Sequence, residues 1–251
     1  MSTVSNDRAA WLKGPATACS HAPGNLQRPW RLVLLGAPGV GKGTQASLLC
    51  GQLGSCHLST GDIFRAAKGQ KLSECSPAMT VALECMMMGE LVADSTVVSI
   101  VKERRACMRC GGGFLLDGFP RTLDQAEELE KLLGNENLKL DAAINYELPL
   151  DQIVARLSGR RTCAECKAVY HKTERPSKVN GVCDKCGGML VQREDDREAA
   201  VRVRMAAYDR STSPLIDFYA GRKLLLTIPA AGTPNEILAR TLSALGVASR
   251  A

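Results

Sequence analysis

The chain has 251 residues, of which 45% are hydrophobic, so it is long enough to bury one substantial core with small inserted lobes. It contains no apolar run of membrane-spanning length, which argues against a helical membrane protein. The formal net charge of +6 suits arginines gathered around phosphates, but by charge alone it leaves nucleic acid open as a partner.

The eleven cysteines indicate the expected compartment. Their number is odd, and no apolar secretory segment precedes the predicted core, so an extracellular disulfide framework is disfavoured. We therefore expect a reducing environment and a cytoplasmic protein.

Residues 1–30 are polar and irregular, and turn-forming pairs such as Gly14-Pro15 and Pro23-Gly24 predict a flexible extension. The segment carries three basic residues against one acid. An organellar transit peptide is therefore a second, less favoured interpretation. We assign this extension no function.

A glycine-rich loop from Gly36 to Thr44 follows the apolar run Leu32 to Leu35. This order of strand, loop and helix start is typical of a phosphate site, because the glycines let backbone N–H groups converge on phosphate oxygens. The helix dipole and the charge of Lys42 add to that attraction. The sequence therefore predicts a nucleoside triphosphate site rather than an ordinary strand-to-helix turn.

The loop departs from the general pattern at one position. Gly43 stands directly after the lysine, where Ser or Thr would hold magnesium, and Thr44 comes one place later. We therefore expect Mg²⁺ to be held mainly through the phosphates of the nucleotide and through water. This disfavours a motor-type or switch-type hydrolase.

From Arg31 onward, short apolar runs alternate with longer amphipathic stretches, which is typical of a parallel sheet covered by helices. We predict an α/β protein: a three-layer P-loop fold with a parallel five-stranded sheet. The expected strands are Leu32–Leu35, Cys56–Leu58, Phe114–Leu116, Ala142–Tyr146 and Leu224–Ile228. The expected helices are Gly43–Leu53, Pro77–Met88, Ser95–Arg105, Leu123–Leu133, Leu150–Leu157, Arg197–Tyr219 and Asn235–Leu245.

Two stretches interrupt this alternation within the core of residues 31–251. Residues 59–88 predict a helical insert without strands. Residues 159–196 are rich in Cys, Gly and charge, and they predict an inserted lobe.

Unusual residues follow the second and third strands, and loops at the carboxyl ends of parallel strands are where such folds bind ligands. Ser59 to Arg65 follow the second strand, and Asp117 to Gln125 follow the third. Asp117 could simply cap a turn. Beside a phosphate loop, however, the end of a hydrophobic strand is also the place for an acid that organises magnesium, and we favour that role.

Four cysteines in the lobe form the pairs Cys163-x2-Cys166 and Cys183-x2-Cys186, with sixteen residues between the pairs. This spacing suits a tetrahedral four-thiolate zinc site. Four protein ligands leave no open position on the metal, so we expect the zinc to be structural and to hold together a lobe too small for its own core. A further pair, Cys107-x2-Cys110, has no second pair and is interpreted as two reduced thiols.

Arginines are prominent in the loops and around the lobe. Phosphoryl transfer needs aligned reactants, neutralised charge and exclusion of water, and an arginine fork can hold phosphate oxygens through two bonds. Any one of these arginines could be a surface residue, but together they favour phosphate binding. The arginines are Arg65, Arg121, Arg156, Arg160, Arg193 and Arg204.

Asp195 and Asp196 stand where the lobe returns to the core. They could bond to arginines, metal-bound water or a nucleotide, or begin the next helix favourably at its N-terminus. Charged hinges on both sides of the lobe suggest a lid that closes over the triphosphate and expels water.

Together these motifs resemble adenylate kinase of the long type with a zinc-bearing lid, from Arg31 to about Leu245. The resemblance implies reversible transfer of the terminal phosphoryl group of MgATP to AMP, giving two ADP, without a covalent intermediate. The motifs that carry it, in the order of the family, are Gly36 to Thr44, Ser59 to Arg65, Phe114 to Gln125, Gly159-Arg160-Arg161, the four cysteines and Arg193 to Arg204.

The resemblance also implies roles for individual residues. The ATP phosphates would be held by Gly39, Val40, Gly41, Lys42, Gly43 and Thr44. The AMP site, in the insert 59–88 and the loops beside it, would comprise Thr60, Arg65, Glu90, Leu91, Val92, Gly118, Phe119, Pro120, Arg121 and Gln125, with Gln125 on the adenine edge. Catalytic positions would be Lys42, Arg121, Arg160, Arg193, Arg204, Asp195 and Asp196, with Arg156, Val169 and Tyr170 near the adenine of ATP and Asp117 near magnesium.

The segment Ala231-Gly232-Thr233-Pro234 departs from the family, which often has Lys or Gln after a similar turn. Triphosphate base specificity could therefore be looser. The alternatives are a nucleoside monophosphate kinase for another base, or a zinc-lobe adaptor for nucleic acid or protein on an inactive core. We favour a monomer whose partners are ATP, AMP and ADP, with neither nucleic acid nor membrane.

Overall fold

The computed structural model describes residues 28–67, 74–88, 92–109 and 111–247. Of the predicted extension, residues 1–27 lie outside this part, and Trp30 already begins the first strand. The first half contains β1 Trp30–Leu35, α2 Lys42–Leu53, β2 Cys56–Ser59, α3 Thr60–Ala67, α4 Pro77–Met87, α5 Asp94–Glu103, α6 Arg105–Met108, β3 Gly113–Asp117 and α7 Leu123–Asn135. The second half contains β4 Ala142–Glu147, α8 Leu150–Gly159, β5 Arg160–Cys163, β6 Val169–His171, β7 Leu190–Val191, η3 Glu194–Asp196, α9 Glu198–Ala207, η4 Tyr208–Thr212, α10 Pro214–Gly221, β8 Leu225–Pro229 and α11 Pro234–Ala244.

A five-stranded sheet forms the centre of the molecule, with strand order β2-β3-β1-β4-β8 and every neighbouring pair parallel. This confirms the predicted α/β class and its five strands. The strand ends differ from the prediction by one or two residues. Because β1 pairs with both β3 and β4, the loop that follows it emerges at the middle of the sheet, where parallel α/β folds bind ligands.

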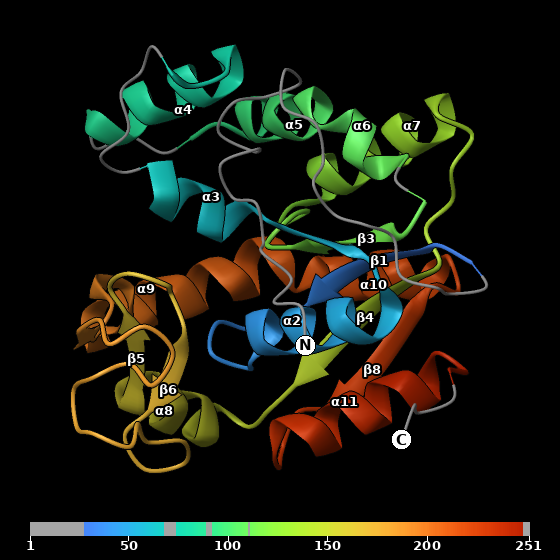
Figure 1. Cartoon of the computed structure of the whole chain (residues 1–251). Helices are drawn as coiled ribbons and strands as arrows, with labels where there is room; N and C mark the ends of the chain where they lie inside the picture. Colours follow the sequence, from blue (N-terminus) through green and yellow to red (C-terminus); the bar gives the residue numbers. More distant parts are fainter. Residues whose placement is uncertain (1–27, 68–73, 89–91, 110, 248–251) are drawn as a thin grey trace.

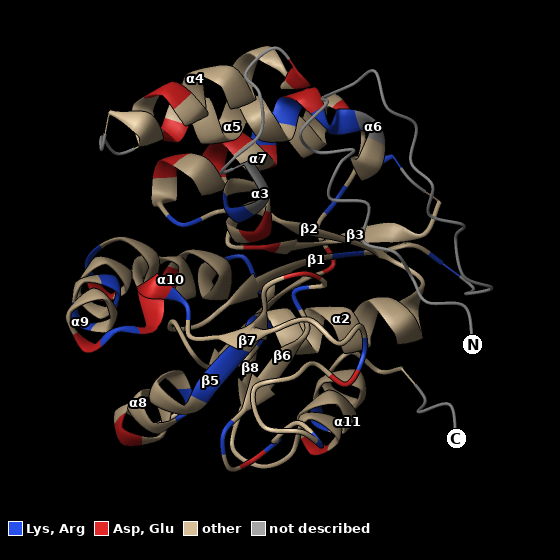
Figure 2. Ribbon diagram, turned by 60° about the vertical axis from the view of Figure 1, so that its left-hand side comes forward, with Lys and Arg blue, Asp and Glu red and all other residues tan. Residues whose placement is uncertain are grey.

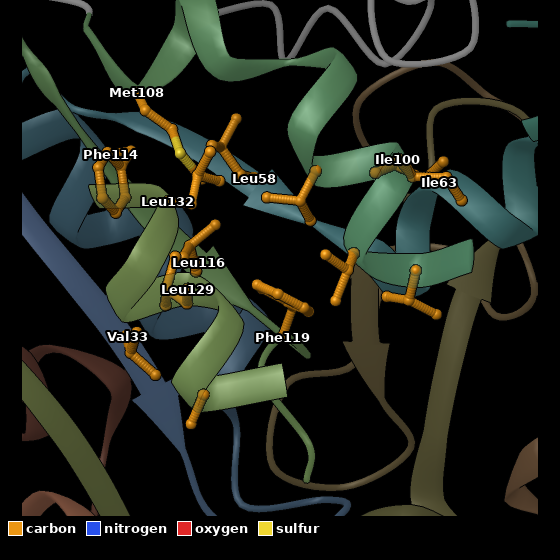
Figure 3. Close-up of a cluster of buried hydrophobic side chains, with 14 of the residues drawn as sticks. Val33, Leu58, Ile63, Ile100, Met108, Phe114, Leu116, Phe119, Leu129 and Leu132 are labelled. Carbon is orange, nitrogen blue, oxygen red and sulfur yellow. The ribbon is translucent and has the colours of Figure 1, made fainter. Parts of the chain in front are cut away.

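Helices cover both faces of the sheet, because side chains alternate between the faces along each strand (Figure 1). Val33 and Leu35 belong to a cluster with residues of α4, α5, α7 and α10, part of which appears in Figure 3. Leu32 and Leu34 belong to a second cluster with α2, α8 and α11. In the described part of the chain, no helix has both the length and the apolar character needed to span a bilayer.

The inserted lobe contains a three-stranded antiparallel sheet in the order β6-β5-β7. Its strands are two to four residues long. The sequence analysis assigned no strand here, because such short strands show no clear alternation. The sheet places Arg160 at the junction between α8 and the lobe.

The segment predicted as one helix, Arg197–Tyr219, is helical but is not a single regular α-helix. The segment forms α9, the π-helical turn η4 and α10. Ser213 N donates to Tyr208 O at 2.9 Å, five residues back, and Pro214 follows with no N–H to continue an α-helical ladder. A π-helical turn therefore precedes the proline, and the backbone at Ser213 remains helical.

Candidate active site

The loop after β1 places a positive charge at the start of α2. Gly41 has a φ of 102°, which disfavours a side chain, and it directly precedes Lys42. Lys42 Nζ donates to the carbonyl oxygens of Gly36 at 2.6 Å and Ala37 at 3.0 Å. The ammonium thus lies within the loop, beside the positive end of the α2 dipole, which favours an anionic ligand.

Asp117, the last residue of β3, lies beside this loop. A Cβ built on Gly43 would stand 3.7 Å from Asp117 Oδ2, and His57 Nε2 lies 3.3 Å from the same oxygen. Burial raises the pKa of Asp117, but the hydrogen bond and charge of His57, with the charges of Lys42 and Arg121, outweigh burial and hold that pKa below its ordinary value. The carboxylate is therefore ionised.

His57 is a site residue that the sequence did not predict. It lies on β2, and the pairing of β2 with β3 brings it beside Asp117. A pattern read along the chain does not reveal this, because the two residues are sixty positions apart.

The start of α3, which follows β2 directly, meets the loop after β3 at Gly118. The carbonyl oxygen of Gly118 accepts from Thr60 Oγ1 at 2.8 Å and from Arg121 Nε at 2.8 Å. Gly118 has a φ of 81°, and a Cβ there would lie 2.8 Å from Thr60 Oγ1. Phe119 packs into the core, and its peptide bond to Pro120 is cis. The charges of Arg121 and Asp117 act on each other.

Gln125 is buried in the first turn of α7 and is bonded at both ends of its amide. Its Oε1 accepts the N–H of Arg121 at 2.8 Å, and its Nε2 donates to Asp94 Oδ1 at 2.7 Å. Asp94 is a second residue that sequence analysis missed, because it lies on α5, thirty-one positions away.

The lobe and the helix after it contribute three more arginines. Arg160 binds both carboxylate oxygens of Asp196, with Nε 2.7 Å from Oδ2, and the Asp196 side chain is fully buried. Arg204 lies 3.1 Å from Asp195 Oδ2, and Arg193 Nε donates to Thr162 Oγ1 at 2.9 Å. Figure 2 shows Lys and Arg on β5 and α9, the elements that carry Arg160 and Arg204. Asp195 and Asp196 thus pair with arginines and precede α9 without beginning it.

The charges of these residues act on one another. Loss of hydration lowers the pKa of Lys42; Asp117 opposes this, but Arg121, Arg204 and Arg160 lower it further, to about 8. Burial and the charges of Arg160 and Arg65 likewise lower the pKa of Arg193, to about 10.

Like charges raise the free energy of a protein unless an anion neutralises them. The fold nevertheless gathers six cationic residues from distant parts of the chain, an arrangement suited to binding several phosphate groups. They are Lys42, Arg65, Arg121, Arg160, Arg193 and Arg204.

Arg156 lies at the edge of this region and connects two loops. Its guanidinium donates to Val40 O at 3.3 Å and to Gly232 O at 3.4 Å. Gln45 Nε2 donates to Pro234 O at 2.9 Å, and Arg240, which sequence analysis missed, donates to Ala231 O at 2.5 Å. The segment Ala231–Pro234, whose sequence differs from the pattern expected at this turn, is therefore held against the start of α2.

The four lobe cysteines form a cluster. Their sulfur atoms all lie within 4.8 Å of one another; Cys163 and Cys186 are 3.4 Å apart, and Cys166 and Cys183 are 3.6 Å apart. Tyr170 is buried with Cys163 and Cys183, and its hydroxyl lies 3.4 Å from Cys183 Sγ. The Tyr170 side chain therefore packs inside the lobe.

The remaining predicted site residues fall in three places. Val169 lies on β6 beside Tyr170. Val92 is half-buried and packs against the hydrophobic cluster that contains Val33, Leu35 and residues of α4 and α5. Gly39 and Thr44 lie in the glycine loop and in α2, and Gly39 closely approaches Leu157 of α8. Glu90, Leu91 and Cys110 lie outside the described residues.

Comparison with known proteins agrees with this geometry. The family model described as "Adenylate kinase" matches residues 34–224. The chain is 47% identical over 215 residues to an adenylate kinase of Acidothermus cellulolyticus, and the matched region covers 86% of this chain and 97% of the relative. It is 47% identical over 207 residues to that of Thermodesulfovibrio yellowstonii (82% and 94%) and 46% identical over 215 residues to that of Carboxydothermus hydrogenoformans (86% and 99%). The fold, the loops at the strand ends and these similarities together show that the chain is a phosphotransferase that belongs to the adenylate kinase family.

Proposed function

We propose that the protein reversibly transfers the terminal phosphoryl group of MgATP to AMP, giving two ADP, and so balances the adenine nucleotides. The observation that carries this proposal is that six cationic side chains act on one another electrostatically, two of which, Lys42 and Arg121, also act on Asp117. Two nucleotides meeting end to end bring several phosphates to one place, and this arrangement would neutralise them.

The donor side comprises the glycine loop, Gly39 to Thr44, with Lys42 following the charge of the moving group. Arg156 and the main chain at Val169 and Tyr170 border the adenine of ATP. Support comes from Arg156, which already joins the loop to the turn at Gly232.

The acceptor side comprises Thr60, Arg65, the segment Glu90 to Val92, Gly118 to Arg121, and Gln125. The hydrogen bonds to Gly118 O hold Thr60, at the start of α3, and Arg121, in the loop after β3, close enough together to contact one ligand. Gln125 reads the adenine edge.

Closure of the lobe, residues 159–196, completes the site. Arg160, Arg193 and Arg204 surround the transferred group; Asp196 orients Arg160, Asp195 orients Arg204, and Thr162 orients Arg193. Excluding water prevents hydrolysis of ATP and strengthens each electrostatic contact.

The residues present fit magnesium. Mg²⁺ is usually bound through one or two carboxylates together with substrate phosphates and water. Asp117 supplies an ionised carboxylate next to the phosphate loop, and Thr44 is the nearest hydroxyl in sequence after the lysine. The bound ion would neutralise charge on the phosphates. Asp117 would hold the ion, and His57 would hold the Asp117 carboxylate in position.

The cysteine cluster fits structural zinc. Zn–S bonds of about 2.3 Å place the sulfurs of a tetrahedral site about 3.8 Å apart, close to the observed separations. Zinc would hold the short strands of the lobe together and so keep Arg160 and Arg193 in position.

We expect the purified wild type to contain about one zinc ion per chain. The variant Cys186→Ser should lose this zinc, and its lobe should unfold at a lower temperature. Cys186 is exposed, so serine disturbs packing little; Cys85→Ser, on α4, is the matched control and should retain zinc. Metal analysis with thermal unfolding measures both properties. Equal zinc content in the wild type and Cys186→Ser would contradict the proposed metal site.

The cell compartment and oligomeric state follow from the same features. The lobe cysteines lie together in an arrangement suited to zinc-bound thiolates, which suits a reducing cytoplasm. All proposed contacts come from one chain, so we propose a monomer that needs neither nucleic acid nor a membrane.

Acceptor specificity tests the proposed function. Coupled assays with MgATP and AMP, GMP, CMP or UMP should give the highest kcat/KM with AMP. A higher value with another base would assign a different monophosphate kinase. Salt-sensitive binding of nucleic acid without turnover would instead indicate an adaptor on an inactive core.

A further inference from the structure

The amide of Gln125 is held in one orientation by two partners of opposite character. The N–H of Arg121 donates to Oε1 at 2.8 Å, and Asp94 Oδ1 accepts from Nε2 at 2.7 Å. A backbone N–H can only donate and a carboxylate can only accept, so a turned amide would lose both bonds. Gln125 is 3% exposed, so bulk water would not replace them.

Asp94 is itself held in place. It is the first residue of α5, and its Oδ2 accepts from Thr122 Oγ1 at 2.6 Å. Thr122 caps the N-terminus of α7 by accepting the N–H of Gln125. One carboxylate therefore joins the start of α5 to the start of α7, and each of its oxygens has a separate partner.

We propose that Asp94 is a positioning residue that sets the base selectivity of the acceptor site through Gln125. This rests on the proposed function, in which Gln125 reads the adenine edge of AMP. Asp94 takes one N–H of the amide and Arg121 takes one lone pair, which leaves one donor and one acceptor for the base.

The fixed order of that donor and acceptor matters for the choice between bases. Adenine presents a ring acceptor at N1 beside an amine donor at C6, whereas hypoxanthine presents an N1–H donor beside a carbonyl acceptor. A fixed amide matches only one of these orders, and a free amide can turn to suit either. Asp94 therefore favours AMP over IMP.

The test measures kcat and KM for AMP and for IMP at saturating MgATP. In Asp94→Ala we expect KM for AMP to rise about fivefold to tenfold, with kcat changed by about twofold or less. The preference for AMP over IMP should fall about tenfold. Asp94→Asn should restore most of this preference, because its oxygen can accept from Gln125 while its amide donates to Thr122.

Two controls separate positioning from a merely structural effect. Asp124→Ala removes an exposed acid from the same first turn of α7 and should leave KM and base preference unchanged. In a Gln125→Ala background, Asp94→Ala should not change the base preference further, because the amide that it positions is gone. Thermal unfolding of each variant shows whether it is folded.

The proposed role of Asp94 is wrong if Asp94→Ala leaves the AMP-to-IMP preference unchanged, or if the Gln125→Ala background still responds. Either result leaves the proposed function intact, because the wild type still phosphorylates AMP. A wild type that prefers a different acceptor base would overturn the proposed function and this inference with it.

Discussion

Arg193 is half-buried beside other arginines, and its acidic neighbours neutralise its charge incompletely. Burial and the charges of Arg160 and Arg65 lower its pKa despite Asp195 and Asp196. In Arg193→Gln we expect turnover to fall about 10²-fold or more, because one donor to the transition state is lost. The unfolding temperature of the ligand-free protein should stay the same or rise, because a repulsive charge is removed.

Kinetics and thermal unfolding of Arg193→Gln check this prediction. Arg202→Gln is the matched control, because Arg202 is exposed on α9 and pairs only with its neighbour Glu198 among the contacts described. Clear destabilisation that accounts for the lost turnover would contradict the prediction. Arg160→Ala is less informative, because it would leave the buried Asp196 carboxylate without its bidentate partner.

Lys42 makes the stability of the ligand-free protein depend on pH. Its folded pKa is about 8, against an ordinary value of 10.5. Between these values the unfolded chain binds the proton more tightly, so stability from this group rises with pH. Below about pH 8 both states are protonated, and the unfavourable contribution is fully present.

Thermal unfolding of the wild type and Lys42→Met across pH 7 to 10.5 measures this contribution. The wild type should gain stability relative to Lys42→Met as the pH rises above about 8. A difference that is constant or falls over this range would show that the ammonium is not destabilised by its neighbours.

At the residue scale, sequence predicted best the positions whose chemistry is local. The glycine loop with Lys42, and Asp117 at a strand end, have signatures within a few residues. His57 and Asp94 have none, because strand pairing and the packing of α5 beside α7 bring them to their partners. Sequence also gave no indication that Tyr170 packs its hydroxyl against Cys183.

At the element scale, the joint between α8 and the lobe depends on the contact between Gly159 and His171. A Cβ on Gly159 would lie 2.0 Å from His171 Nε2 and 2.4 Å from the adjoining ring carbon. The ring cannot move freely, because the N–H of Glu174 donates to its Nδ1 at 3.0 Å and its Nε2 lies 3.4 Å from Ala155 O.

We therefore expect Gly159→Ala to lower the free energy of unfolding by about 1–3 kcal/mol. Adding His171→Ala should restore part of this loss, because the ring no longer occupies the space. Gly134→Ala, at an uncrowded helical position, is the control and should be neutral or slightly stabilising. Denaturant unfolding measures all four proteins, and equal stability of Gly159→Ala and wild type would contradict the contact.

Sequence predicted elements well where hydrophobic pattern and local propensity agree. The buried strand of residues 30–35 and helix 123–135 are examples, and only their ends shifted. The predicted helix over Arg197–Tyr219 contains a π-helical turn that the pattern did not predict, because Pro214 has no N–H to donate to the α-helical ladder.

At the scale of the whole molecule, the site depends on residues that the chain supplies from Lys42 to Arg204. The central sheet fixes the glycine loop and both strand-end loops, and the lobe returns Arg160 and Arg193 to the same place. The motifs predicted which residues take part. The partners that each residue uses, such as Asp196 for Arg160, required the structure.

The central claim is that two nucleotides exchange a phosphoryl group within this one site. Incubation of the purified protein with ADP and Mg²⁺, followed by separation of the nucleotides, tests it most directly. We predict that ATP and AMP appear in equal amounts, without inorganic phosphate, and that EDTA prevents the reaction. Formation of AMP and phosphate without ATP, or no turnover by zinc-loaded protein, would contradict the account.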